Sequence, residues 1–201
     1  MTGICTPARL LATLAILALL ALLIVGFIQL ASSTSSGSSA PALTLAQVRA
    51  RLAGSPAPLA ALHAQASELL LGDASVLAAR IAALHGYPLV IDKWASWCVP
   101  CQDERGSFQQ ASVSYGRTVA FLGIDSRDTS LADGRAFLSS YPVGYPSYYD
   151  RSGSLGTAIA DSPFTPVTVF YDRTGRRFIY QGPFPSAAKL EADIRRYALD
   201  Q

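Results

Sequence analysis

A pair of cysteines at the junction between an apolar run and a helical pattern constrains this chain more than any other feature. The stretch WASWCVPCQDE spans residues 94–104 and separates Cys98 from Cys101 by two residues. It overlaps the end of PLVIDKWA, residues 88–95, a short apolar run that is typical of a buried strand. Residues 99–115 then have the pattern of a helix that begins at the cysteines. The sequence therefore predicts a dithiol held between a strand and a helix.

This position gives the two cysteines different chemistry. Cys98 stands at the N-terminus of the predicted helix, where free backbone N–H groups and the helix dipole favour a thiolate, the nucleophile of disulfide exchange. Cys101 follows one turn later and is close enough to attack a mixed disulfide on Cys98 and release the product. Pro100 restricts the backbone between them. We therefore predict a redox-active Cys98–Cys101 disulfide, with Cys98 as the attacking thiol and Cys101 as the resolving thiol.

Other uses of a C-x-x-C pair fit the sequence less well. Haem attachment needs a histidine directly after the second cysteine, where Gln102 stands. A structural zinc site needs four ligands, and the sequence has neither a second C-x-x-C nor paired histidines. A purely structural disulfide would close a very short loop and gain little loop entropy. We predict redox exchange, with no metal site and no cofactor.

The apolar run LLATLAILALLALLIVGFIQL, residues 10–30, carries no charge. A helix needs about 20 apolar residues to cross a bilayer, which is more than the apolar core of a cleaved secretory signal. We predict a retained single-pass transmembrane anchor, with a cleaved signal as the alternative. Because Arg9 is the only charged residue before the run, the positive-inside rule places residues 1–9 in the cytoplasm. The bulk of the chain is then expected on the extracytoplasmic side of a bacterial cell membrane.

Composition narrows the function further. The 201 residues contain 16 Lys and Arg and 14 Asp and Glu, a formal net charge of +2. The basic residues form no clustered patch along the sequence, so no nucleic-acid partner is predicted. Cys5 precedes the predicted anchor, where an idle thiol is expected, with acylation as the alternative. The other two cysteines are left together in a compartment that favours disulfides.

The chain between the anchor and the cysteines divides into a linker and a helical segment. Residues 31–43 are small and polar, as in a flexible linker. Residues 44–72 have the pattern of two helices, over 44–53 and 57–71, separated by Gly-Ser-Pro. We predict a helical extension of unspecified role, followed by the main domain over residues 73–201.

The main domain has alternating helical and strand patterns. The expected elements are a helix over 75–85, a strand over 88–95, a helix over 99–115, a strand over 118–125, a helix over 129–140, strands over 145–150, 166–172 and 176–182, and a helix over 185–199. Strands joined through helices imply parallel pairing, and DRTG between the last two strands predicts an antiparallel hairpin. The order predicts an α/β fold, with a central mixed sheet flanked by helices.

The cysteine stretch resembles the active site of thioredoxin-fold oxidoreductases, and specifically of the membrane-anchored TlpA/ResA-like branch. WASWCVPC, Glu104 three residues after the second cysteine, GID at 123–125 and PVTVF at 166–170 carry the resemblance, which covers roughly residues 73–201. It implies a thioredoxin fold and thiol:disulfide oxidoreductase activity on disulfide-bearing or dithiol proteins. It also implies the reducing direction, as in cytochrome c maturation, with a membrane electron donor that re-reduces the pair.

The resemblance extends to residues outside the cysteine pair. Pro166 matches the cis-proline of the family, and Thr165 before it would have backbone groups free to pair with an extended substrate. Asp92 stands six residues before the first cysteine, where thioredoxin has a proton-exchanging aspartate. Since LVID otherwise has a buried pattern, we predict that Asp92 has a raised pKa and assists Cys101. The alternative is an edge-strand aspartate that faces water.

Three further positions bear on the site. Trp97 directly precedes the first cysteine, and we expect it either to shield the disulfide and bind partner surface or only to pack. Phe121 stands where thioredoxin has the lysine that partners the buried aspartate, so a more apolar environment is expected there. Gly106 stands where the family has a proline in the active-site helix, and glycine permits a similar bend less firmly.

Three rival functions remain for the sequence. A peroxiredoxin-like peroxidase needs a threonine or serine and a proline where Ala95 and Ile91 stand. A copper metallochaperone usually has three residues between its cysteines and a distant histidine. A membrane-tethered binding module with a purely structural disulfide would keep full activity when Cys98 is replaced by serine.

Overall fold

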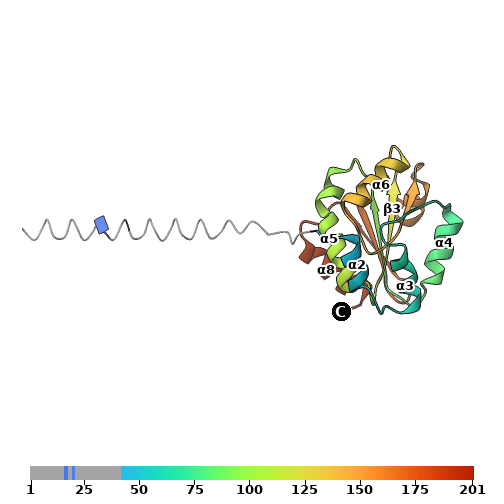
Figure 1. Cartoon of the computed structure of the whole chain (residues 1–201), viewed down its shortest axis with the longest axis horizontal. Coiled ribbons are helices and arrows are strands. Elements are labelled where there is room, and N and C mark those ends of the chain that lie inside the picture. The colour runs from blue at the N-terminus through green and yellow to red at the C-terminus, as the bar shows by residue number, and fades with distance from the viewer. Residues whose placement is uncertain (1–15, 18–19, 21–41) are drawn as a thin grey trace, which may run out of the picture. The chain divides into compact units, whose positions relative to one another are not determined.

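The computed structural model describes residues 16–17, 20 and 42–201. Most of the predicted anchor and linker, and Cys5, lie outside the described residues. Within the part that is described, no helix is both long enough and apolar enough to cross a membrane. Pro41–Gln201 form one compact unit, in which a sheet lies between helices (Figure 1).

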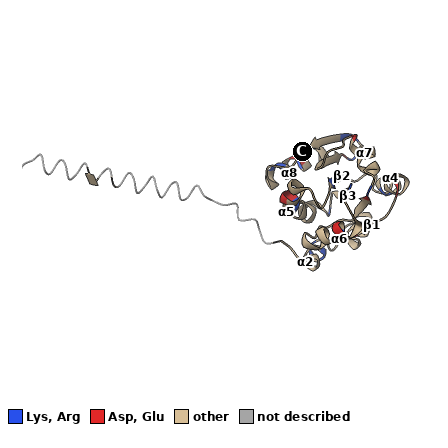
Figure 2. Cartoon of the chain, turned by 90° about the horizontal axis from the view of Figure 1, so that it is seen from above, with Lys and Arg blue, Asp and Glu red and all other residues tan. Residues whose placement is uncertain are grey.

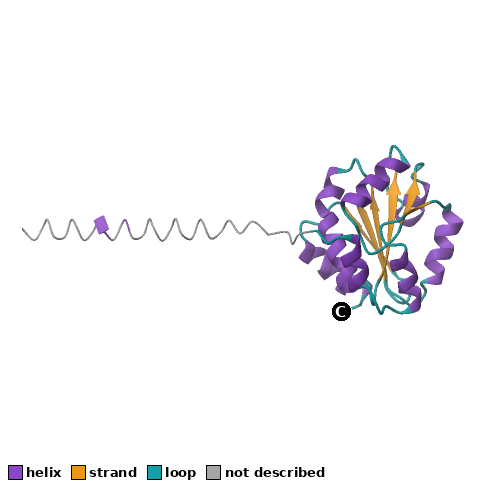
Figure 3. Cartoon of the chain, in the orientation of Figure 1, coloured by secondary structure: helices purple, strands orange, loops and turns teal. Residues whose placement is uncertain are grey.

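In the described part of the chain, six strands form a mixed sheet in the order β1-β4-β3-β2-β5-β6 (Figure 3). β2 (Leu89–Trp94), β3 (Ala120–Ser126) and β4 (Ser147–Asp150) pair in parallel. β5 (Val167–Tyr171) is antiparallel to β2, and β6 (Arg177–Gln181) is antiparallel to β5. Every residue of β2 and β3 is buried, as expected of parallel strands that are covered on both faces. The predicted parallel pairs and the late hairpin are confirmed.

Helices cover both faces of the sheet. Their bounds are α2 (Leu45–Arg51), α3 (Ala57–Ala64), α4 (Ala74–Ala83), α5 (Val99–Tyr115), α6 (Leu131–Ser140), α7 (Ser154–Ala160) and α8 (Ala187–Asp193), which continues as a π-helical turn, η1 (Ile194–Ala198). Side chains of α5, α6 and α8 pack in one hydrophobic cluster with one face of the sheet. Side chains of α3, α4 and α7 pack in a second cluster with the other face. Figure 1 shows α5 and α8 on one side and α3 and α4 on the other.

Side-chain alternation along β2 decides which residues face the cysteine helix. Val90 and Trp94 belong to the cluster on the α5 side, whereas Leu89 and Ile91 belong to the opposite cluster. Because successive strand side chains point to opposite faces, Asp92 faces α5. Lys93 faces the other side, where its Nζ donates to the carbonyl oxygen of Ser162 at 2.6 Å. Asp92 and Lys93 therefore lie on opposite faces of the sheet.

The structure contains two elements that were not predicted, an edge strand and a short helix. The helix expected over 57–71 ends at Ala64, because Ser67 adopts a positive φ of 61° and its N–H bonds to the carbonyl of Tyr145. Leu69–Leu70 instead form β1, which pairs in parallel with β4 at the sheet edge. Helix α7 has no counterpart in the sequence analysis, because its short stretch SLGTAIA has too few large apolar residues to show a period.

The segment over residues 44–72 packs into the same compact unit as the cysteine domain. Thr44 caps α2 by a reciprocal capping box with Gln47. Leu59 and Leu62 of α3 are buried in the cluster that also holds Ile91 of β2. The segment therefore supplies an edge strand and part of the core.

Charged residues of both signs are interspersed over the helices and strands of this unit (Figure 2). A surface cavity of about 460 Å³ is lined by Arg176, Arg177, Phe178, Arg196, Tyr197, Asp200 and Gln201. It lies at the end of the sheet where β2 begins, since Tyr171 pairs with both Leu89 and Arg177. The cysteines follow the other end of β2, so this cavity is remote from them.

Candidate active site

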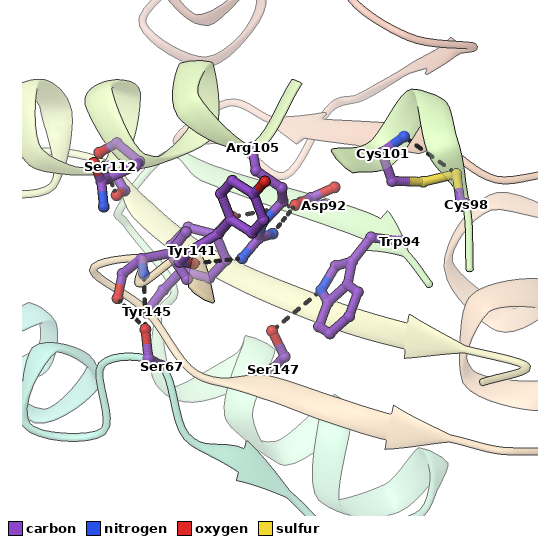
Figure 4. Close-up of polar contacts among 12 residues, drawn as sticks. Ser67, Asp92, Trp94, Cys98, Cys101, Arg105, Ser112, Tyr141, Tyr145 and Ser147 are labelled. Atoms are coloured by element: carbon purple, nitrogen blue, oxygen red, sulfur yellow. Dashed lines mark hydrogen bonds and ion pairs between the residues drawn. A yellow bond between two sulfur atoms is a disulfide. The ribbon is translucent and has the colours of Figure 1, made fainter. Parts of the chain in front are cut away.

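Cys98 and Cys101 form a disulfide at the start of α5, with their Cα atoms 5.2 Å apart (Figure 4). Cys98 is the N-cap residue of α5, and its Sγ accepts a hydrogen bond from the backbone N–H of Cys101 at 3.3 Å. Cys98 is 3% exposed, whereas Cys101 is fully buried. An incoming thiolate therefore meets the Cys98 sulfur first, and the helix N–H groups are placed to stabilise negative charge there.

The short loop between β2 and α5 is held in place by its own backbone and by α5. The N–H of Cys98 donates to the carbonyl of Ala95, and the side chain of Gln102 donates to the carbonyl of Ser96 at 2.7 Å. Pro100 lies in the first turn of α5, where its missing N–H leaves no intrahelical bond unmade. The helix therefore begins at the disulfide, as predicted.

A second loop, between β3 and α6, holds the same segment from the side. The carboxylate of Asp128 accepts from both the N–H and the hydroxyl of Ser96, at 2.9 and 2.7 Å. The indole N–H of Trp97 donates to the carbonyl of Arg127 at 3.1 Å, while its side chain stays 55% exposed. Trp97 is therefore fixed in orientation and still open to a partner. Asp128 was not predicted from the sequence, where its only signal is its place shortly after the GID motif.

The peptide bond between Thr165 and Pro166 is cis, as the family resemblance implied. The β2–β5 ladder pairs Lys93 with Val167, so Pro166 and Thr165 continue that ladder toward the residues that follow β2. The structure thus brings these two residues to the same end of the sheet as the cysteines. Their predicted role in substrate binding stays a prediction.

Asp92 is buried under the site, so the alternative of a water-facing aspartate is wrong. It is 1% exposed, and its Oδ2 accepts from Nη1 of Arg105 at 3.0 Å and from the hydroxyl of Tyr145 at 3.2 Å. Its Oδ1 is buried and has no hydrogen-bond partner among the described residues. Burial raises the pKa of Asp92 to about 6, against the opposing effects of Arg105 and Tyr145. The predicted direction of this pKa is confirmed.

The expected apolar environment of Asp92 is wrong, because α5 supplies a cation. The Arg105 side chain is 1% exposed, and its guanidinium lies 5.2 Å from the ring centroid of Trp94 and 5.1 Å from that of Phe137. Phe121 does line the region, stacked on Tyr145. The signal for Arg105 was its helical spacing, since it follows the buried second cysteine by four residues and therefore shares its face of α5.

Glu104 is a second buried carboxyl beside the cysteines. It is 4% exposed, its Oε2 accepts from the N–H of Phe184 at 2.9 Å, and its Oε1 has no partner in the described part of the chain. Burial, and then the charge of Asp92, raises the pKa of Glu104 to about 8. At pH 7 this group is therefore mostly neutral, and Asp92 with Arg105 forms the ionised pair.

Asp125, the last residue of GID, is a third buried carboxyl. It is fully buried, and burial, followed by the neighbouring Asp128, raises its pKa to about 9. A Cβ at position 134 would lie 2.1 Å from Asp125 Oδ2, so only glycine fits there.

Among the residues that the structure describes, no group of three or more His, Cys, Asp or Glu side chains is placed to hold a metal ion.

Solved structures provide a comparison for this arrangement. MTB dsbF, in its mixed oxidized and reduced forms, matches with a TM-score of 0.53 and 27% identity over 57% of this chain and 83% of that one. A secreted Mycobacterium tuberculosis disulfide oxidoreductase, homologous to E. coli DsbE, matches with a TM-score of 0.53 and 26% identity over 57% and 85%. The chain therefore has the fold of thioredoxin-like disulfide oxidoreductases.

Sequence comparison gives a further likeness. The soluble secreted antigen MPT53 of Mycobacterium tuberculosis is 29% identical over 118 residues, which cover 59% of this chain and 66% of that protein. The chain thus spans just under two thirds of the length of this relative. No protein-family model matches the chain.

Glu104 gives the stability of the fold a defined pH dependence. Its pKa rises from 4.5 in its ordinary state to about 8 in the folded chain, so the folded state binds this proton more tightly. The stabilisation is complete below the ordinary value and is lost as pH rises through the folded value. We expect the free energy of unfolding to fall between about pH 5 and about pH 8, with at most about 1.4 kcal/mol per pH unit from this group.

Urea unfolding of the oxidised protein across this pH range is the measurement. Glu104→Gln keeps the size and the hydrogen-bond acceptor but does not titrate, so it should make the slope less steep. Asp92 and Asp125, whose pKa values are also raised, should keep part of the slope. Glu191→Gln, on α8, is the matched control. An unchanged slope in Glu104→Gln would show that this carboxyl is not the source.

Proposed function

We propose that the chain is a thiol:disulfide oxidoreductase that exchanges disulfides with other proteins. The observation that carries this proposal is the Cys98–Cys101 disulfide at the N-terminus of α5, in the same buried region as the Asp92–Arg105 pair. Reduced Cys98 attacks a substrate disulfide, and Cys101 then resolves the mixed disulfide. Asp92 is proposed as the group that takes the proton of Cys101.

The finer assignment follows the TlpA/ResA-like resemblance. We place the reaction on the extracytoplasmic side of a bacterial cell membrane, with residues 10–30 as the anchor. Two of the relatives are named as secreted proteins, which supports an extracytoplasmic site. The proposed direction is reduction of disulfides in secreted or membrane proteins, such as those that mature into cytochromes c. A membrane electron donor would then re-reduce the pair.

The surface around the disulfide suggests how a protein substrate is held. Trp97 and Val99 flank the first cysteine and are 55% and 62% exposed, and Phe164 is 67% exposed. The β2–β5 register, extended by three residues, brings Phe164 opposite the loop that precedes the cysteines. We name Trp97, Val99 and Phe164 the apolar collar. It suits an extended polypeptide with apolar side chains near its cysteine, paired to the backbone of Thr165.

Replacement of each cysteine tests the proposed reaction. Cys98→Ser should abolish reduction of a protein disulfide such as that of insulin, because the attacking sulfur is lost. Cys101→Ser should keep the first attack and accumulate a mixed disulfide, which is visible as a heavier species on a non-reducing gel. Full activity in Cys98→Ser would favour the non-catalytic binding module instead.

The reduction potential of the pair tests the direction of electron flow. We expect a value near that of thioredoxin, about −270 mV, or lower. Equilibration of the protein with defined thiol buffers, followed by alkylation of the free thiols, gives this value. A potential near about −120 mV, as for a strong oxidant, would make the protein a disulfide donor.

The apolar collar predicts a selective loss of protein substrates. Phe164→Ser should slow exchange with an unfolded, disulfide-bearing polypeptide by about tenfold or more, because about 1.5–3 kcal/mol is available from burying one such side chain. The rate with dithiothreitol should be unchanged, since so small a reagent does not need the collar. Val76→Ser, at an exposed apolar residue of α4, is the control. Equal losses with both reagents would exclude a docking role.

A further inference from the structure

Arg105 is the one cation in contact with the buried carboxyl groups of the site, as far as the structure describes the chain. Its Nη1 bonds to Asp92 Oδ2 at 3.0 Å, and its Nη2 points to the carbonyl of Tyr141 at 3.5 Å. Both ends of the pair are almost fully shielded from water, at 1% and 2% side-chain exposure. The aromatic rings of Trp94 and Phe137 enclose the guanidinium, so the interaction with Asp92 is little screened.

A buried ion pair is a poor way to stabilise a fold. Removing two charged groups from water costs free energy that their mutual attraction often fails to recover, and well-packed apolar residues do as well or better. Arg105 also leaves its Nε buried without a partner among the described residues. Arg105 lies on the face of α5 that it shares with Cys101, which indicates a role in the chemistry.

The two oxygens of the Asp92 carboxylate differ in their hydrogen bonds. Arg105 and Tyr145 both donate to Oδ2, whereas Oδ1 has no partner in the part of the chain that is described. Figure 4 shows the Asp92 carboxyl between Arg105 and the Cys98–Cys101 pair. Oδ2 is thus occupied by donors, and Oδ1 is the oxygen that remains open to a proton.

We propose that Arg105 is a positioning residue for disulfide exchange, which keeps Asp92 ionised and turned so that Oδ1 receives the proton of Cys101. This inference rests on the proposed function. A lysine on the neighbouring strand is absent, since that position is Phe121. Arg105 supplies the cation instead, from α5, the helix that begins at the two cysteines.

The step in which Arg105 acts is the resolution of the mixed disulfide. The thiol of Cys101 gives its proton to Asp92 Oδ1, and the resulting thiolate attacks Cys98 Sγ. The bond between the two protein sulfurs forms while the bond from Cys98 to the substrate sulfur breaks. The substrate leaves as a thiolate and takes the electron pair, so the protein dithiol is oxidised and the substrate is reduced. The proton on Asp92 then neutralises a thiolate or passes to water.

Every charged or titratable group that faces Asp92 affects the balance between its ionised and neutral forms. Arg105 and the hydroxyl of Tyr145 favour the ionised form, whereas a charge on Glu104 would oppose it. The raised pKa of Glu104 leaves that group mostly neutral at pH 7. Asp125, on β3, is also neutral at this pH because of its raised pKa. Arg105 is therefore the cation that counters the effect of burial on Asp92.

The test follows both sulfurs with an aromatic disulfide reagent on the full chain. Attack by Cys98 releases one coloured thiolate, and attack by Cys101 on the mixed disulfide releases the second. The rate of the second release reports the resolving step. In the wild type, its pH midpoint should lie near the pKa of Asp92, about 6.

Arg105→Met removes the charge and keeps a long side chain. An arginine lowers the pKa of a nearby carboxyl by about 1 to 3 pH units, so the midpoint should rise by about two. The second release at pH 7 should then be about tenfold slower and should recover at higher pH. Arg105→Lys should lie close to the wild type. Arg49→Met, at an exposed arginine of α2, should leave the profile unchanged.

Repeating the measurement in the Asp92→Asn variant distinguishes a positioning role of Arg105 from a general structural effect. In Asp92→Asn, which has no carboxylate to hold, addition of Arg105→Met should cause no further shift of the midpoint. The double variant also removes both buried charges. Its midpoint can therefore still be compared with that of Asp92→Asn even if Arg105→Met alone does not fold. A midpoint that is unmoved by Arg105→Met, or a shift that persists in the Asp92→Asn background, overturns the proposal. Failure of the wild type to release the second thiolate would instead reject the proposed function.

Discussion

The pairing of β2 on both of its edges determines where every part of the site lies. β2 is parallel to β3 on one side and antiparallel to β5 on the other. The cysteine loop, which follows β2, therefore lies between the Asp128 loop after β3 and the Thr165–Pro166 bond before β5. Because the strand is buried on both faces, its alternation also decides that Asp92 lies under α5. The disulfide, the buried carboxyl and the proposed substrate edge all follow from this one strand.

The site combines an exposed surface with a shielded interior. Trp97 and Phe164 are open to a partner, whereas Cys101, Asp92 and Arg105 are almost fully buried. Water weakens charge interactions at the surface but much less in the interior. In the proposed reaction, a partner docks on the apolar collar while the proton transfer takes place out of contact with solvent. The mostly neutral state of Glu104 at pH 7 leaves Asp92 as the ionised carboxyl beside Arg105.

Much of this arrangement could be predicted from the sequence, because local patterns carry it. The strand and helix around Cys98 and the burial of Asp92 follow from short motifs and hydrophobic periods, whereas the position of Pro166 follows from the family resemblance. Arg105 could not be paired with Asp92 in the same way, since nothing in the sequence states which charges meet across 13 positions. β1 was missed for a related reason. Two leucines fit a helix as well as a strand until the turn at Ser67 and the pairing with β4 decide between them.

The opposite charges of two adjacent residues on β2 also protect the fold against a misaligned sheet. Asp92 meets a guanidinium on one face, and Lys93 meets the carbonyl of Ser162 on the other. A slip of β2 by one residue would exchange the two faces. It would bring an ammonium against Arg105 and a carboxylate against a carbonyl oxygen, which is repulsive on both sides. These two charges therefore penalise the nearest incorrect register of β2 while the chain folds.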